Sequence, residues 1–153
     1  MRSWIIWTAK YPQTPLFGRT AEKRFRNWRL ISEYWSYLHG PANRIIVPIY
    51  FGKIAEKRDD IRAAVPQTHA ELERFEGYLD GAPWLAGKAI GAADIAIYPF
   101  VKSLLRAASK DAAAPLDLGL LPFAARYPRL AAWAERVEAL PGYQRTYPPH
   151  WRQ

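Results

Sequence analysis

The 153-residue sequence contains no cysteine and only one methionine. The lack of cysteine excludes disulfide bridges, thiolate zinc sites and a cysteine nucleophile within these residues. No apolar run reaches the roughly 18 residues of a membrane-spanning helix. The apolar segment from Trp4 to Ala9 is shorter than the roughly 7–15 residues of a signal-peptide core. We therefore expect a soluble, cytoplasmic chain that has no membrane partner.

The sequence also lacks the short motifs of self-contained catalytic sites. It has no Gly-x-Ser-x-Gly elbow, no phosphate-binding loop and no His-Glu-x-x-His. Glu71, Glu73 and Glu76 cluster on one predicted helix, but Arg74 beside them favours a solvated surface. His69 has no second histidine or convincing carboxylate set at metal-ligand spacing, so we expect a hydrogen-bonded histidine in a core or interface. We therefore predict no catalytic residue, no metal ligand and no cofactor.

The chain is strongly basic. Its 22 Lys and Arg against 14 Asp and Glu give a net charge of +8, with a pI of about 9.9. A basic domain can bind nucleic acid, an anionic membrane or acidic small molecules. The densest basic group would spread over more than one face of a helix, and no nucleic-acid-binding signature accompanies it. A solvated or steering charge is therefore favoured, and nucleic acid is not an expected partner. The group consists of Arg19, Lys23, Arg24, Arg26 and Arg29.

A turn rich in glycine and proline leads into the most apolar stretch of the sequence. Gly81, Pro83, Gly87 and Gly91 mark the turn, and nearly every residue from Ala92 to Val101 is apolar. A helix that is apolar on all sides is usually buried at the centre of a domain. The sequence therefore predicts a buried central helix that starts after Gly91.

Asp94 is the exception in this apolar stretch. It stands three residues after Gly91, where a carboxylate can accept a hydrogen bond from the N-cap amide and meet the positive end of the helix dipole. Asp94 could instead be a catalytic acid or a ligand. Its position in the first turn favours a buried helix cap, with Gly91 as the N-cap residue.

These residues resemble the glutathione S-transferase family. Residues 83–87 read Pro-Trp-Leu-Ala-Gly and residues 91–94 read Gly-Ala-Ala-Asp, which is similar to the family motif that opens the central helix of its C-terminal domain. The sequence departs at Gly91, where the family usually has Ser or Thr. Residues 127–133, Tyr-Pro-Arg-Leu-Ala-Ala-Trp, resemble a later family helix. The resemblance implies an all-α, glutathione S-transferase C-terminal-like bundle around the central helix.

A long helix is predicted from Ala21 to His39. Aromatic residues recur there at helical spacing, and a second stripe contains Leu30 and two tyrosines. We expect the first stripe, Phe25, Trp28 and Trp35, to lie in the core. Tyr34 or Tyr37 could line a cleft or a subunit interface, although core packing is favoured.

The sequence predicts four further helices and places the breaks between them. His39-Gly40-Pro41 should end or kink the first helix. The next helix should run from Asn43 towards Arg58, with a bend at Pro48. The remaining helices are expected at about 60–79, from Ala92 to 108, and from 127 to about 140.

The resemblance divides the chain into four parts. Residues 1–12 resemble the end of the last helix of a thioredoxin-like domain, and the rest of that domain is expected to be missing or truncated. Residues 13–20 form a linker, residues 21–142 form the helical domain, and residues 143–153 form a tail.

In complete transferases the thioredoxin-like half holds the activating residue and most glutathione contacts. The helical half forms a wall for the hydrophobic co-substrate and much of the dimer contact. The resemblance therefore implies glutathione and a hydrophobic electrophile as substrates, a homodimer, and no activity from this chain alone. Candidate substrate-binding residues are Tyr34, Tyr37 and His39, with Arg26 or Arg29 steering the anionic thiol.

Two other interpretations remain open at the level of sequence. The same helical domain can serve as a non-catalytic protein–protein interaction module. The chain could also be a truncated or mis-started gene product with little function of its own.

Overall fold

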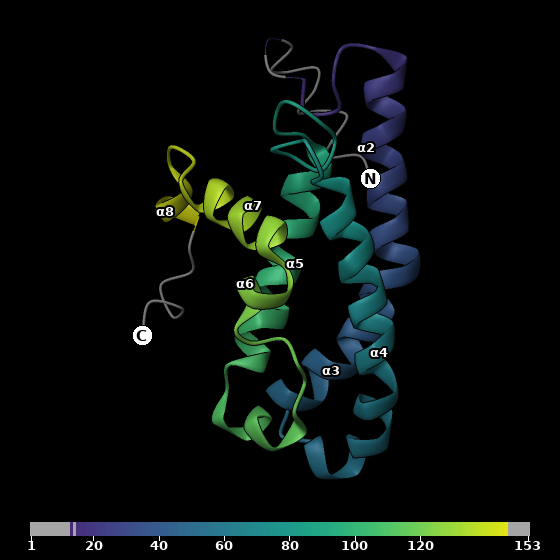
Figure 1. Ribbon diagram of the computed structural model, residues 1–153, viewed down its shortest axis with the longest axis vertical. Helices are drawn as coiled ribbons and strands as arrows, with labels where there is room; N and C mark the ends of the chain where they lie inside the picture. The colour runs from purple at the N-terminus through teal and green to yellow at the C-terminus, as the bar shows by residue number, and fades with distance from the viewer. Residues whose placement is uncertain (1–12, 14, 147–153) are drawn as a thin grey trace.

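The computed structural model describes residues 13 and 15–146, which form helices joined by turns and loops, with an isolated β-bridge between Trp84 and Gly87 and no strand. The predicted all-α architecture is therefore confirmed (Figure 1). None of the described helices is long and apolar enough to cross a membrane. The elements are α2 (Ala21–Glu33), the π-helical turn η1 (Tyr34–Leu38), α3 (His39–Tyr50), α4 (Ile54–Tyr78), α5 (Ala92–Ala108), the 3₁₀ turn η2 (Asp111–Leu116), α6 (Phe123–Arg126), α7 (Pro128–Glu138) and α8 (Tyr143–Thr146).

The first predicted helix does not end at His39. Instead, η1 joins α2 to α3 through a wider turn, in which the His39 amide bonds the carbonyl of Tyr34. Pro41 has no amide hydrogen to donate to the preceding turn, and a π turn is one way in which a helix continues past such a site. The helix predicted over 43–58 is also wrong in its boundary. α3 ends at Tyr50, and Gly52, with φ of +67°, turns the chain into α4.

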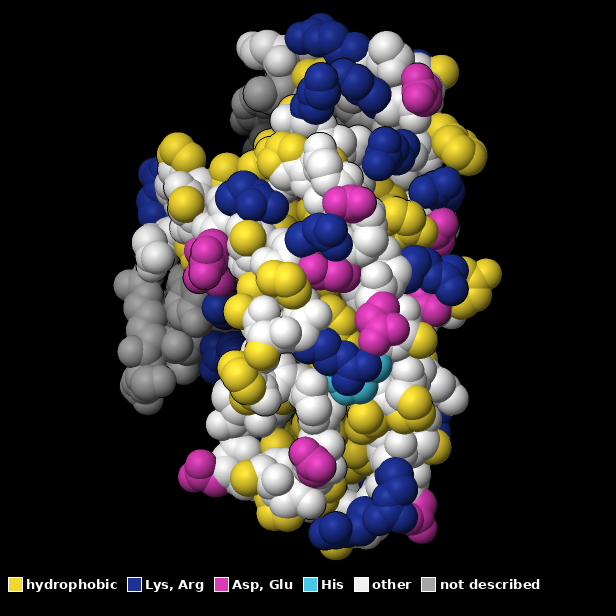
Figure 2. All heavy atoms as spheres, viewed as in Figure 1, with side chains coloured by type: hydrophobic (Ala, Val, Ile, Leu, Met, Phe, Trp, Pro, Cys, Tyr) yellow, Lys and Arg dark blue, Asp and Glu magenta, His cyan; other side chains and the backbone are white. Residues whose placement is uncertain are grey.

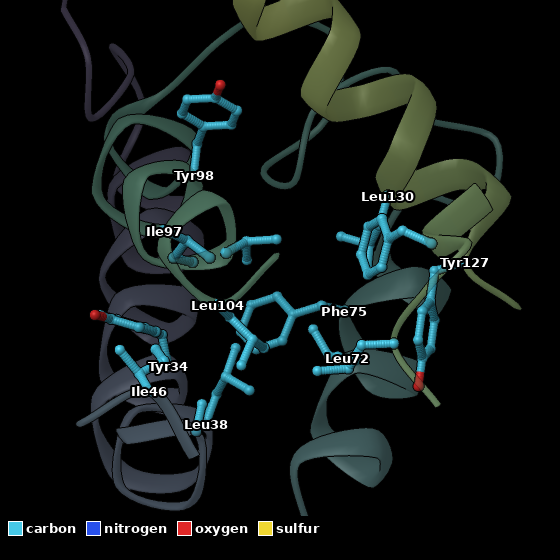
Figure 3. Packing of buried hydrophobic residues seen from close by; sticks show 14 of the residues in the cluster. Tyr34, Leu38, Ile46, Leu72, Phe75, Ile97, Tyr98, Leu104, Tyr127 and Leu130 are labelled. Carbon is cyan, nitrogen blue, oxygen red and sulfur yellow. The ribbon is translucent and has the colours of Figure 1, made fainter. Parts of the chain in front are cut away.

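The helix α5 occupies the centre of the fold, as predicted (Figure 1). It packs against α2, α3 and α7. Figure 3 shows Ile97 and Leu104 of α5 pointing toward Phe75 of α4. Burial is not uniform around the helix, because Ile95 is 39% exposed. One side of the apolar stretch therefore faces outward.

The predicted core face of α2 is wrong. Phe25, Trp28 and Trp35 are 67%, 41% and 58% exposed. The side that packs on the core is instead formed by Asn27, Leu30, Tyr34 and Leu38. Both stripes have helical spacing. The polar Asn27 lowers the hydrophobic signal of the stripe that is buried in the structure.

Only some of the predicted domain limits lie within the residues that the structure describes. The linker residues 13 and 15–20 precede α2, and α8 lies at the start of the predicted tail. The predicted end of a thioredoxin-like helix at 1–12, and the tail beyond residue 146, lie outside the described residues.

Candidate functional site

Asp94 lies completely buried at the start of α5. Its Oδ2 accepts a hydrogen bond from the Gly91 amide at 2.8 Å. Its Oδ1 accepts from the Leu85 amide at 2.9 Å and from the indole Nε1 of Trp133 at 2.8 Å. One carboxylate thus joins the turn before α5, the first turn of α5 and the helix α7.

Burial raises the pKa of Asp94, and the hydrogen bonds from Leu85, Gly91 and Trp133 oppose this rise. Both carboxylate oxygens are already engaged inside the protein. No substrate can reach the group from solvent. This geometry fits a helix cap and leaves no surface for a catalytic acid.

Asn27 of α2 completes the same helix start. Its Oδ1 accepts a hydrogen bond from the Ala93 amide at 3.0 Å, while its Nδ2 donates to the Lys23 carbonyl at 3.0 Å. The Ala92 amide donates to the carbonyl of Leu16 at 2.8 Å. An N-cap hydroxyl normally serves an amide of the first turn. Here Asn27, from another helix, supplies the acceptor that Gly91 lacks.

Four rings meet where η1 and α5 come together. The His39 ring lies 4.3 Å from Trp35 and stacks on Phe100 at 5.1 Å, measured between ring centroids. Tyr34 meets the edges of His39 at 5.7 Å and of Phe100 at 5.1 Å. We call these four residues the His39 cluster. His39 and Phe100 are half-buried and Trp35 is exposed, so the cluster forms an apolar surface that a ligand can reach.

Within the cluster, Tyr34 and His39 have different environments. Tyr34 is buried, and desolvation raises the pKa of its hydroxyl to about 12. Figure 3 shows that this hydroxyl points away from the labelled core residues. The side-chain amide of Asn43 lies 3.0 Å from Nε2 of His39. His39 therefore presents a ring face and an oriented polar edge.

The structure does not bring the other three candidates into this cluster. Tyr37 is 53% exposed and lies under the guanidinium of Arg74 from α4, 5.8 Å from the ring centroid. Arg26 is exposed on α2 and has no carboxylate partner among the described residues. Arg29 pairs with Glu33 at 3.4 Å, so of the five candidates only Tyr34 and His39 lie together.

Trp35 and Phe100 belong to the cluster but were not predicted as site residues. Trp35 precedes His39 by four residues, a spacing that places two residues on one helix face. This spacing could have indicated the pair, but it equally fits the core stripe predicted for Trp35. Phe100 comes from α5, and no spacing in the sequence connects it to η1.

His69 is a buried, hydrogen-bonded histidine. Its Nδ1 pairs with the Tyr127 hydroxyl, and its Nε2 lies 2.8 Å from the Leu118 carbonyl. Because a carbonyl only accepts, Nε2 carries the proton. A polar hollow of about 420 Å³ lies beside it, with Glu73 and Arg126 paired at 2.7 Å on its wall. The described residues contain no group of three or more His, Cys, Asp or Glu side chains that could hold a metal ion.

A second, more apolar groove of about 570 Å³ lies between α5 and the ends of α7 and α8. At one wall the Tyr98 hydroxyl donates to Glu138 at 2.8 Å and also contacts the Tyr143 hydroxyl. Lys102 donates to the same carboxylate at 2.6 Å. Burial is the main cause that raises the pKa of Tyr98. These groups satisfy one another, so the groove contains no activated acid or base.

Comparison with known proteins identifies the fold. Residues 39–141 match the family model described as glutathione S-transferase, C-terminal domain. A glutathione S-transferase from Xanthobacter autotrophicus Py2 superposes with a TM-score of 0.65 at 20% identity, over 84% of this chain and 57% of that one. A mutant of a poplar glutathione transferase superposes with a TM-score of 0.70 at 17% identity, over 90% of this chain and 61% of that one.

The two solved structures show a shared fold, and the chain spans about three fifths of their length. No curated protein sequence matches the chain significantly. The family model, however, covers well over half of the sequence and includes the central helix with its cap. The chain therefore belongs to the glutathione S-transferase family and contains its C-terminal helical domain.

Proposed function

We propose that this chain is the helical half of a glutathione-conjugating protein, in which the His39 cluster forms part of the wall for a hydrophobic co-substrate. The observation that carries the proposal is the meeting of four aromatic rings, two of them half-buried and one exposed. Walls of this kind bind apolar ligands, and a few polar groups orient them. The edge of His39, next to Asn43, is such a polar group.

Glutathione itself needs a site for an anionic peptide with a thiol. Within the described residues, the aromatic surface of the His39 cluster carries no pair of charged side chains that would hold it. We therefore propose that a thioredoxin-like domain supplies the glutathione site and the activating residue, and that the 153 residues alone are inactive. Titration calorimetry with glutathione and a conjugation assay on this chain should give no signal, with folding checked by circular dichroism.

The wall is tested in a fusion of an active thioredoxin-like domain to this chain. His39→Ala should raise KM for an aryl halide several-fold and leave KM for glutathione unchanged, because only the apolar wall is altered. Phe51→Ala is the matched control, since Phe51 is a 72% exposed aromatic residue outside the cluster. Equal kinetics for the two variants would reject the wall.

The proposal includes a homodimer with contacts along η1 and α4. Tyr37 and Arg74 support it, because an exposed aromatic ring under a guanidinium combines residue types that are enriched in protein interfaces. Sedimentation velocity of the fusion should give the mass of two subunits. Tyr37→Glu should shift the distribution towards one subunit.

The second candidate function is a non-catalytic protein–protein interaction module. The exposed rings of Phe25, Trp28 and Trp35 favour it, because such side chains often anchor a partner protein. The DNA upstream of Met1 distinguishes the two candidates. An in-frame thioredoxin-like sequence favours the transferase, and an unrelated sequence favours the module.

A further inference from the structure

The first half of α2 alternates basic and aromatic residues. Residues 23–29 read Lys-Arg-Phe-Arg-Asn-Trp-Arg. With about 3.6 residues per turn, Phe25 lies roughly opposite Asn27 and Leu30, which face the core. Trp28 is a neighbour of Phe25 on the outer side, and its ring stacks on Phe17 at 4.7 Å. Two aromatic side chains thus lie on the outer side of the helix, and Phe17 holds one of them, Trp28.

Basic side chains surround these rings. By the same helical geometry, Arg24 lies on one side of Phe25, while Arg26 and Arg29 lie on the other. Arg29 pairs with Glu33 at 3.4 Å. The other basic residues of this end have no carboxylate partner among the described residues. We define the α2 face as Phe25 and Trp28 together with Arg19, Arg24 and Arg26, since the same geometry places Lys23 on the opposite side of the helix, near Asn27.

This arrangement costs stability within the chain. Cations near a helix N-terminus face the positive end of the helix dipole, and Glu22 is the only acid in the first turn of α2. Phe25 is 67% exposed, so its ring adds little to the core. Residues that oppose the usual preferences of a helix and add no stability to the fold often serve a function. Here the positive charge without carboxylate partners favours an anionic partner.

We propose that the α2 face binds the surface of an anionic lipid bilayer. Phe25 and Trp28 enter the interfacial region, and the guanidinium groups contact lipid phosphates beside them. Aromatic and basic residues on one side of a helix are the composition of segments that lie on membranes. Figure 2 shows hydrophobic and basic side chains, with a few acidic ones between them, along the upper right edge of the molecule, where Figure 1 places α2.

The shape of the α2 face favours a bilayer over other anionic partners. It is a single helix on the outer edge of the fold, and neither groove described above is lined by it (Figure 1). A flat surface can contact the ring of Phe25 and the cations on both sides at once. A nucleic acid is a less suitable partner, because Phe17 already covers one face of the Trp28 ring on which a base would stack. A second copy of this face would oppose cation to cation.

The lack of a membrane-spanning helix among the described residues does not conflict with this proposal. A helix that lies on a bilayer needs a charged side and an exposed apolar stripe, not a long apolar run. From the sequence, we expected no membrane partner and expected the basic charge to be solvated or to steer ligands. We also expected Phe25 and Trp28 in the core, whereas the structure exposes them.

The test is co-sedimentation of the full chain with vesicles of phosphatidylcholine alone or with about 30% phosphatidylserine, at low and high salt. Binding should require phosphatidylserine and should fall sharply with salt. Phe25→Glu should weaken binding at least tenfold, because it places a carboxylate against the anionic surface. Arg24→Gln should weaken it about fivefold, the effect of one basic residue near such a surface.

Two control variants lie away from the α2 face. Phe51→Glu changes an aromatic residue that is 72% exposed, and Arg62→Gln changes an arginine that pairs with Asp59 at 3.3 Å. Neither should reduce binding measurably, because both residues lie outside the α2 face. Phe25→Ser serves as a second test if Phe25→Glu fails to fold by circular dichroism.

Three results would overturn the proposal. The first is no binding to the phosphatidylserine vesicles. The second is equal loss of binding in Phe25→Glu and Phe51→Glu. The third is tighter binding to poly(U) than to vesicles, with Phe25→Glu reducing the poly(U) binding, which would assign the α2 face to nucleic acid.

Discussion

The side-chain oxygen of Asn27 lies 2.5 Å from the position that a β-carbon on Gly91 would occupy. The backbone of Gly91 is extended, with φ of −136° and ψ of −178°, so other residues could adopt it. Glycine is therefore required by space and not by conformation. Asn27 fills that space and accepts the hydrogen bond of the Ala93 amide. A Ser or Thr at position 91 would normally accept that bond with its hydroxyl.

Gly91→Ser should destabilise the protein by about 1–3 kcal/mol, because the new β-carbon collides with Asn27. Asn27→Ala should cost about 1–2 kcal/mol, because the Ala93 amide loses its acceptor. The double variant should be more stable than the sum of the two losses predicts, since the introduced serine hydroxyl could then cap α5 itself. Urea unfolding of all four proteins measures this coupling. Additive losses would show that Asn27 and Gly91 act independently.

Asp94→Asn should destabilise the fold by about 3–5 kcal/mol. The amide cannot accept hydrogen bonds at its nitrogen, so one of the three buried donors on Asp94 loses its partner and the new amide protons are buried unpaired. Asp59→Asn is the control, because its side chain is 94% exposed. A difference between the two variants below about 1 kcal/mol would contradict the role of Asp94 as the buried cap.

The start of α5 was predictable because its information is local. The spacing of Gly91 and Asp94 sets the capping contact, and the apolar run sets the burial. The bonds from Leu85 and Trp133 were not predictable, because they join Asp94 to segments that only the tertiary fold brings near. The same holds for Asn27, whose partner at Ala93 is 66 residues away.

The face of α2 could not be chosen correctly from spacing alone. Two stripes recur at three and four residues, and the more aromatic one, with Phe25 and Trp28, gave the stronger hydrophobic signal. The buried stripe contains Asn27 and Tyr34 and looks less apolar. Burial there depends on hydrogen bonds that Asn27 makes across the fold, which periodicity does not detect.

His69→Leu should cost about 2–4 kcal/mol, because the Leu118 carbonyl and the Tyr127 hydroxyl both lose their partner. The double variant His69→Leu, Tyr127→Phe should recover part of the loss, since it leaves only the carbonyl unpaired. Urea unfolding of the native protein, of His69→Leu, of Tyr127→Phe and of the double variant measures the loss and its partial recovery. A double variant less stable than His69→Leu would show that Tyr127 has another role.

Tyr34→Phe should make the stability of the protein less sensitive to alkaline pH. Burial raises the pKa of Tyr34 from 10.0 to about 12, so the unfolded chain ionises this hydroxyl first. The contribution of Tyr34 is complete below pH 10 and is lost as the pH rises from 10 towards 12. At about pH 11 the loss relative to about pH 8 is about 1.4 kcal/mol.

Urea unfolding of the native protein and of Tyr34→Phe at about pH 8 and about pH 11 gives this difference directly. The substitution should cost little at the lower pH, because within the described part of the chain no hydrogen bond to the Tyr34 hydroxyl is present. The other buried tyrosines, Tyr98 and Tyr127, titrate in both proteins and cancel from the comparison. Tyr37→Phe, which removes a half-exposed hydroxyl from the same turn, is the control. If native protein and Tyr34→Phe lose equal stability between the two pH values, Tyr34 is not desolvated in solution, and the His39 cluster is more open than the structure indicates.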